Sequence, residues 1–183
     1  MKRVWILALV AAMTTAAWGG ELAGVTKPDT VEVGDQTLVL NGMGLRKKAM
    51  FKVYVAGLYL TEKMNDAEAI LAADSARRTS MAFLMGVSAD KMCAAWKEGL
   101  EKNTSSPSDA LQAKFDTLCE YQADMEKGEL MIYTYVPGKG TAVEIKGEDK
   151  GTIEGKDFAD ALFACWIGPE PPGEAFKKGL LGL

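Results

Sequence analysis

The sequence contains no histidine, and this absence excludes several kinds of catalysis. Ser–His–Asp and Cys–His nucleophiles, and zinc sites that use histidine ligands, all need an imidazole. A Walker loop, a G-x-G-x-x-G motif and a C-x-x-C pair are missing as well. The sequence therefore predicts neither a metal site nor a cofactor, and it leaves few routes to catalysis.

The sequence also lacks a long basic run, and its overall charge is negative. Lysine and arginine number 21 against 25 aspartates and glutamates. Nucleic-acid binding depends on clustered basic residues, so an acidic surface argues against a nucleic-acid partner. For the same reason, electrostatic binding to a membrane surface is not expected.

Residues 1–19 have the three parts of a cleavable signal peptide. A positive start at Lys2 and Arg3 precedes a short apolar run, and Ala17 and Gly19 occupy the −3 and −1 positions of a cleavage site. The alternative is a transmembrane anchor, but the apolar run is far shorter than the roughly 20 residues that span a bilayer. The sequence therefore predicts an exported protein, periplasmic or secreted, with no stable membrane anchor.

The predicted mature chain, residues 20–183, has the length of one domain with a hydrophobic core. Removing Lys2 and Arg3, the charged residues of 1–19, takes the formal net charge from −4 to −6. Strands are predicted at 30–33, 37–40, 50–60, 79–85, 129–136, 141–146 and 151–153. This order, with helices between and after the strands, predicts an α+β domain whose antiparallel sheet carries helices on one face.

The predicted helices have recognisable starts. Ser88 is expected to cap the first, which carries Met92, Trp96 and Leu100 at helical spacing. Ser106 is expected to cap the second, since Pro107 and Asp109 complete an S-x-x-D capping box. A third helix over 158–166 and a short fourth over 176–180 complete the set.

The strand predicted over residues 50–60 is apolar at nearly every position, with the sequence MFKVYVAGLYL. Such a run is typical of a strand covered on both faces near the centre of a sheet. Before it, Gly42 and Gly44 interrupt the pattern, which indicates a bend or bulge where the backbone needs room.

Two blocks of sequence resemble the chalcone isomerase-like family, in particular its secreted bacterial branch. Residues 40–60, LNGMGLRKKAMFKVYVAGLYL, resemble its N-terminal motif, and residues 157–182 resemble its closing motif of aromatic–Ile–Gly, prolines and Leu-Leu-Gly. The resemblance implies an open-faced β-sandwich, in which a large antiparallel sheet and a layer of helices enclose a ligand cleft. Plant members close a flavanone ring from a chalcone, whereas related non-catalytic members bind fatty acids through an arginine and a tyrosine.

The resemblance can be carried over residue by residue. Arg46 matches the cleft arginine, and Tyr54 matches the strand position that is tyrosine in the fatty-acid binders. Where the plant enzymes have a catalytic Tyr, Lys and Asn, this sequence has Met92, Ala95 and Gly99, none of which transfers a proton. The alternatives are that Arg46 is a solvated cation at a strand end and that Tyr54 is an ordinary core residue.

Methionines and aromatic residues supply a candidate lining for an acyl chain, because thioethers adapt to flexible ligands. They could equally fill the core between the sheet and the helices. These candidates are Met81, Phe83, Met85, Met92 and Trp96.

Three cysteines in an exported protein favour a disulfide bond. Cys93 and Cys119 lie on successive predicted helices, at similar distances from the turn at 105–107, and an antiparallel pair brings them level. We therefore expect a Cys93–Cys119 bridge, with Cys165 left as a buried free thiol.

Together these features predict an exported, non-catalytic binder of a small molecule, with a fatty acid or similar amphipathic carboxylate as ligand. One alternative is an isomerase that acts on a polyphenol-like enone and polarises its oxygen with Arg46 and Tyr54. Another is a scaffold that binds a partner and no ligand. The sequence predicts neither the ligand's identity nor the oligomeric state.

Overall fold

The structure is a computed structural model, and it describes residues 18–183. Its frame is a curled seven-stranded antiparallel sheet in which every strand pairs with its neighbour in sequence. The seven strands are β3 (Thr30–Val33), β4 (Gln36–Lys48), β5 (Phe51–Leu60), β6 (Arg77–Phe83), β7 (Leu130–Val136), β8 (Gly140–Ile145) and β9 (Glu148–Ile153). The predicted α+β fold is confirmed, whereas the predicted signal peptide falls almost entirely on residues 1–17, outside the described residues.

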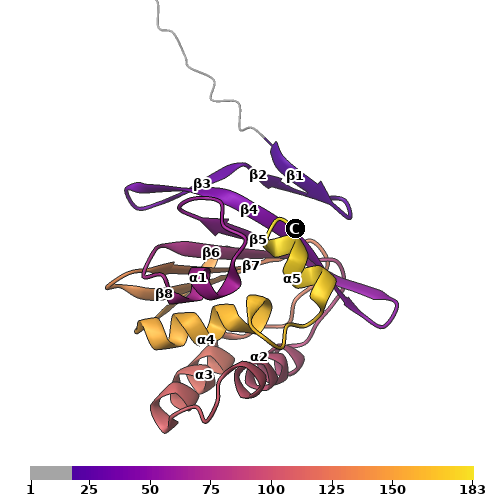
Figure 1. The fold of residues 1–183 in the computed structure, drawn as a ribbon. Helices are drawn as coiled ribbons and strands as arrows, with labels where there is room; N and C mark the ends of the chain where they lie inside the picture. Colours follow the sequence, from indigo (N-terminus) through magenta and orange to yellow (C-terminus); the bar gives the residue numbers. More distant parts are fainter. Residues whose placement is uncertain (1–17) are drawn as a thin grey trace, which may run out of the picture.

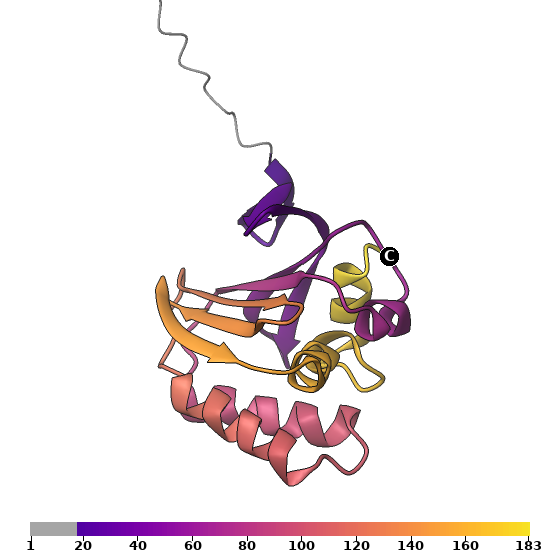
Figure 2. The same cartoon turned by 90° about the vertical axis from the view of Figure 1, so that its left-hand side faces the viewer.

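The helices are α1 (Ala67–Ala72), α2 (Ala89–Asn103), α3 (Asp109–Tyr121), α4 (Lys156–Ile167) and α5 (Glu174–Leu180). The α2, α3 and α4 helices lie on one side of the sheet (Figures 1 and 2). Nine of the twelve residues of α4 are buried, because this helix packs against both the sheet and α2. An all-round apolar helix such as α4 belongs in a core. No helix of residues 18–183 has both the length and the apolar character needed to cross a bilayer.

The cap predicted for α2 is confirmed, whereas the cap predicted for α3 is wrong. Ser88 caps α2 and accepts a hydrogen bond from the Lys91 amide at 3.4 Å. The cap of α3 is Ser108 rather than Ser106, and its hydroxyl accepts from the Leu111 amide at 3.2 Å. Ser106 instead belongs to the turn, with a left-handed φ of 52°, and the residue before a proline is disfavoured in the α region.

Strand β5 is buried from Tyr54 to Leu60, which confirms that it is covered on both faces. The helices cover one face. The other is covered near Gly57 by a hairpin of β1 (Trp18–Leu22) and β2 (Val25–Pro28), which the sequence pattern did not predict. Its residue over the sheet is Lys27, whose ammonium group donates to Ser80 Oγ at 2.8 Å. Lysine is rarely buried, and here it takes the inward-facing position that an apolar residue usually holds. The sequence of the hairpin therefore lacks the alternation of apolar and polar residues by which strands are predicted.

The predicted need for room at Gly42 and Gly44 is confirmed, because helix α5 lies directly on them. An added Cβ would lie 2.2 Å from the Gly179 carbonyl oxygen at Gly42, and 2.6 Å from that of Phe176 at Gly44. Strand β4 continues through these glycines with a shift of register at Asn41. The Asn41 amide donates to the Leu180 carbonyl at 2.8 Å, which fixes α5 on the strand.

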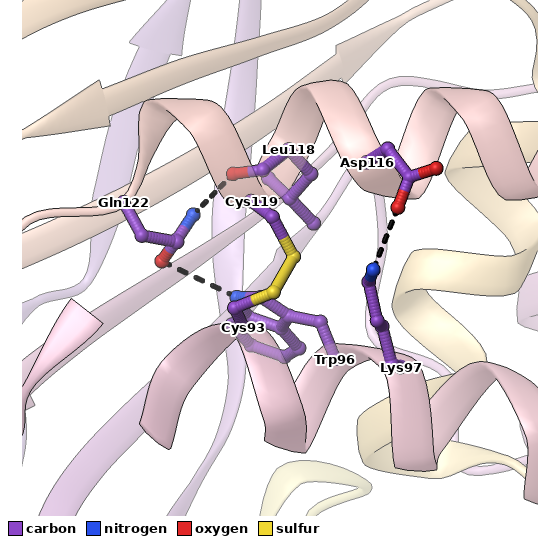
Figure 3. Close-up of a disulfide and its surroundings, with 7 residues drawn as sticks. All are labelled: Cys93, Trp96, Lys97, Asp116, Leu118, Cys119 and Gln122. Carbon is purple, nitrogen blue, oxygen red and sulfur yellow. Dashed lines mark hydrogen bonds and ion pairs between the residues drawn. A yellow bond between two sulfur atoms is a disulfide. The ribbon is translucent and has the colours of Figure 1, made fainter. Parts of the chain in front are cut away.

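The predicted disulfide between Cys93 and Cys119 is confirmed. It joins α2 to α3, with the two Cα atoms 4.9 Å apart (Figure 3). Beside it, Lys97 pairs with Asp116 at 2.7 Å. Cys165 is a buried free thiol, also as predicted.

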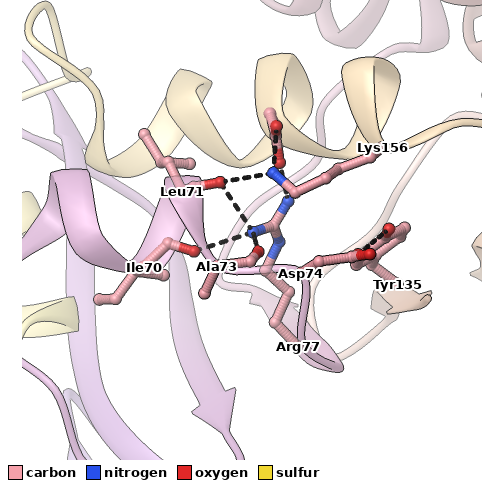
Figure 4. A network of polar contacts seen from close by, with 8 residues as sticks. Ile70, Leu71, Ala73, Asp74, Arg77, Tyr135 and Lys156 are labelled. Carbon is pink, nitrogen blue, oxygen red and sulfur yellow. Dashed lines mark hydrogen bonds and ion pairs between the residues drawn. The ribbon is translucent and has the colours of Figure 1, made fainter.

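A fully buried arginine, Arg77, ties β6 to α1 and α4 (Figure 4). Its guanidinium group pairs with Asp160 of α4 and donates to the Ile70 carbonyl of α1 at 2.9 Å. Aromatic rings surround the rest of the group, since its central carbon lies 5.0 Å from the ring centre of Tyr135 and 4.9 Å from that of Phe163. Hydrogen bonds, an ion pair and ring faces thus offset the cost of burying this cation, and its Nε–H is left without a partner among the described residues.

Candidate functional site

A cavity of about 470 Å³ opens between the β4–β5 hairpin, α2 and the loop from α4 to α5. This volume lies in the range of small-molecule sites, which are largely apolar with a few polar groups. Its apolar lining includes Val53, Met85, Val87, Met92, Trp96 and Trp166.

Arg46 and Tyr54 are brought together by the pairing of β4 with β5. The two residues lie directly opposite each other in the register, so their side chains share a face. Nη1 of Arg46 donates to the carbonyls of Lys47 and of Pro172, the latter at 2.8 Å. The hydrogen bonds of Arg46 within residues 18–183 use Nη1 alone, and the residue lines the cavity, so its Nε and Nη2 donors remain for a ligand.

Tyr54 and Trp166 add two further donors. Burial raises the pKa of the Tyr54 hydroxyl well above its usual range, while the charge of Arg46 acts against this shift. The hydroxyl therefore stays protonated and able to donate. The indole N–H of Trp166 is buried and has no hydrogen-bond partner in the part of the chain that the structure describes, but it lies close enough to the Tyr54 hydroxyl to lower the pKa of that group. A buried donor without a partner is costly, and a ligand acceptor would remove that cost.

The charges around the mouth also favour a negatively charged ligand. Besides Arg46, the cavity is lined by Lys48, Lys91 and Lys102, and Lys102 pairs with Glu98 at 2.5 Å. Glu98 and Glu170 are the lining carboxylates, so positive groups outnumber them. Such an excess of one sign at a cleft concentrates ligands of the opposite sign.

Five of the seven predicted ligand-binding residues line this cavity, namely Arg46, Tyr54, Met85, Met92 and Trp96. Met81 and Phe83 lie instead in the core between sheet and helices, with exposed fractions of 0% and 1%. The predicted strand over 79–85 ends two residues early, because β6 stops at Phe83. Met85 therefore does not continue the in-and-out alternation of the strand, and it lines the opening of the cavity. Trp166 was predicted at the end of the helix over 158–166 and was not identified from sequence as a residue of the site.

The positions matched to the plant catalytic residues also line the cavity. They are Met92, Ala95 and Gly99, and none can take or give a proton. Gly99 allows α2 and α4 to approach closely, because a Cβ there would lie 2.6 Å from the Sγ atom of Cys165. Burial raises the pKa of that thiol to about 12, so it is protonated at neutral pH and unsuited to act as a nucleophile.

Residues 18–183 contain no group of three or more His, Cys, Asp or Glu that could hold a metal ion. The groups that line the described cavity are mainly hydrogen-bond donors, positively charged side chains and apolar side chains. Such a lining is typical of a site that binds an anionic group attached to an apolar body.

Comparisons with known proteins agree with this architecture. The model of the family described as chalcone isomerase-like matches residues 19–182. Among solved structures, the chain is similar to a fatty-acid binding protein of Arabidopsis thaliana, with 21% identity and a TM-score of 0.66. That similarity covers 86% of this chain and 92% of the plant protein, and it shows a shared fold. No curated protein sequence matches. Since the family model spans nearly all of the described residues, this chain belongs to the chalcone isomerase-like family.

Proposed function

We propose that this protein binds a fatty acid or similar amphipathic carboxylate in the cavity between the β4–β5 hairpin and α2. The observation that carries the proposal is the pairing of Arg46 with Tyr54, which brings a guanidinium group and a hydroxyl to one face of the β4–β5 hairpin, in a largely apolar cavity. A carboxylate accepts several hydrogen bonds and carries the charge that complements Arg46. The fold shared with a plant fatty-acid binding protein supports the same ligand class.

The apolar part of the ligand would lie against Met92, Trp96 and Val53. Each buried methylene stabilises a complex by about 0.8 kcal/mol, so a long acyl chain supplies affinity while the donors supply orientation. Binding is favoured over the plant-type cyclisation because Met92, Ala95 and Gly99, which transfer no proton, occupy the positions matched to the plant catalytic residues.

Replacing Arg46 with alanine is expected to weaken binding of a long-chain fatty acid by about tenfold to a hundredfold. A charge-assisted hydrogen bond in such a site is worth about 1.5–3 kcal/mol. Tyr54→Phe removes one hydroxyl without changing the ring, so it should weaken binding less. Isothermal titration calorimetry measures both effects, with circular dichroism to check the fold.

The matched ligand control is the methyl ester of the same acid, which lacks the charge. We expect the ester to bind the wild type more weakly and to be insensitive to Arg46→Ala. If acid and ester bind alike, or Arg46→Ala binds the acid as the wild type does, the carboxylate site is disproved. Stereoselective cyclisation of a chalcone that is lost in Arg46→Ala would favour the isomerase alternative, and binding of neither ligand would favour the scaffold.

Export to the periplasm is part of the proposal, and it rests on the signal-peptide features of residues 1–19. We expect protein recovered from the periplasm of an expressing Gram-negative cell to begin at Gly20. N-terminal sequencing checks this, with the variant Lys2→Glu/Arg3→Glu as the export-impaired control. Recovery of the full chain with Met1 intact from the cytoplasm alone would contradict export.

A further inference from the structure

The tip of the β4–β5 hairpin exposes two large apolar side chains to solvent. Met50 is 86% exposed and Phe51 is 59% exposed. Met50 and Ala49 form the two-residue turn, in which Ala49 has a left-handed φ of 52° that is unfavourable for a residue with a side chain, and Phe51 begins β5 opposite Lys48. Packing within the described chain accounts for neither apolar residue, and an exposed apolar cluster marks an interaction site.

Three exposed lysines, Lys47, Lys48 and Lys52, flank this apolar tip. None of them has a carboxylate partner within 4 Å among residues 18–183. Lys47 and Lys52 lie directly opposite each other in the strand pairing. Like charges in directly opposed positions destabilise a hairpin, so folding does not favour this arrangement.

The basic and apolar tip adjoins the mouth of the cavity. Lys48 and Phe51 belong to both, and Lys91 and Met85 also line the cavity. Met85 is 37% exposed, so a third apolar side chain is available at the opening. The mouth is therefore bordered by exposed apolar groups and by unpaired positive charge.

We propose that the β4–β5 hairpin tip docks on an anionic lipid bilayer, with Met50 and Phe51 in the interface and the flanking lysines against the headgroups. The cavity mouth would then open at the lipid surface, where an amphipathic carboxylate resides. This delivery step rests on the proposed function, whereas the docking itself does not. Apolar residues bordered by lysine are the combination that binds such surfaces.

The net charge of the whole chain led to the opposite expectation from sequence, because it averages over the entire surface. Charges act on a membrane within a Debye length, about 8 Å at physiological salt. Binding to an anionic membrane therefore depends on the local group of unpaired lysines and not on the net charge of the chain. Each lysine near such a surface strengthens binding about fivefold.

Co-sedimentation with vesicles of phosphatidylglycerol or of phosphatidylcholine tests the docking, without added fatty acid. We expect the wild type to bind the anionic vesicles, and 0.5 M salt to weaken this binding. Lys47→Glu should weaken it at least about fivefold. Because the introduced carboxylate would face Lys52, the fold should not be weakened by this change. Met50→Ser removes the most exposed apolar residue of the tip and should also weaken binding.

Lys139→Glu is the matched control, because this exposed lysine lies in the β7–β8 turn at the opposite end of the sheet. It makes the same change in net charge and should leave vesicle binding nearly unaltered. Absence of vesicle binding, equal binding to both lipids, or an equal loss in Lys139→Glu and Lys47→Glu would each overturn the proposal. In the first case a protein partner would be the better occupant of the tip.

The proposal of membrane docking and the proposal of a fatty-acid site can be tested independently of each other. Lys47 and Met50 do not line the cavity, so both variants should bind fatty acid in solution as the wild type does. Transfer of fatty acid from anionic vesicles should be slower in these variants. Vesicle binding without fatty-acid binding would support the docking and refute the proposed ligand, and the reverse result would refute the docking alone.

Discussion

Replacing Arg77 with alanine is expected to lower the free energy of unfolding by about 3–5 kcal/mol. The side chain is fully buried and holds Asp160 of α4, the Ile70 carbonyl of α1 and two aromatic rings at the same time. Its removal leaves a large cavity and deprives the Ile70 carbonyl and the Oδ1 atom of Asp160 of their hydrogen bonds to the guanidinium group. Urea denaturation, followed by circular dichroism, measures the loss.

Arg77→Met is the matched control for this prediction. It keeps much of the aliphatic length without a buried charge, and well-packed apolar replacements of buried ion pairs are often tolerated. Asp160 would keep its partner Lys156, whose ammonium nitrogen lies 2.6 Å away. We expect the loss of unfolding free energy in Arg77→Met to be at most half of the loss in Arg77→Ala. A loss below about 1 kcal/mol in Arg77→Ala would show that this network is not a major source of stability.

Loss of the Cys93–Cys119 disulfide is expected to lower the free energy of unfolding by about 3–4 kcal/mol. The two cysteines are 26 positions apart, and a cross-link of that span removes many conformations from the unfolded chain. In the native state, the Lys97–Asp116 pair and the hydrogen bond from the Trp96 indole to Gln122 still join α2 to α3 (Figure 3). The folded helical hairpin should therefore persist without the bridge.

The measurement compares urea midpoints with and without reductant, for the wild type and for Cys93→Ala/Cys119→Ala. We expect reductant to lower the midpoint of the wild type and to leave that of the double variant unchanged. If both cysteines are alkylated in native protein that has not been reduced, the bridge does not form in solution.

The features that sequence predicted well are those with strong local signals. The apolar run of β5 and the Ser88 cap of α2 follow from the identity of neighbouring residues alone. The disulfide followed from distances along two helices that a short turn makes antiparallel. The sequence resemblance supplied Arg46 and Tyr54, which the structure places side by side at the cavity.

The features that sequence missed depend on contacts between distant segments. The β1–β2 hairpin lies over β5 through Lys27, whose burial no pattern of apolar residues predicts. Trp166 reaches the cavity because α4 packs between the sheet and α2, and the position of its N–H beside Tyr54 is visible only in three dimensions. For Ser106, the S-x-x-D pattern gave the wrong cap because Ser108, two residues later, also fits a cap.

The contact of α5 with Gly42 and Gly44 has a consequence for the timing of synthesis. The Asn41 side chain bonds to Leu180, 139 positions later, and Arg46 bonds to Pro172, 126 positions later. At roughly 5–20 residues per second, a ribosome makes Pro172 roughly 6–25 s after Arg46. During that interval β4 lacks its covering helix and the arginine lacks the carbonyl that orients it. The cavity is therefore completed only after nearly all of the described chain has been synthesised, and a nascent chain has no finished site with which to capture ligand.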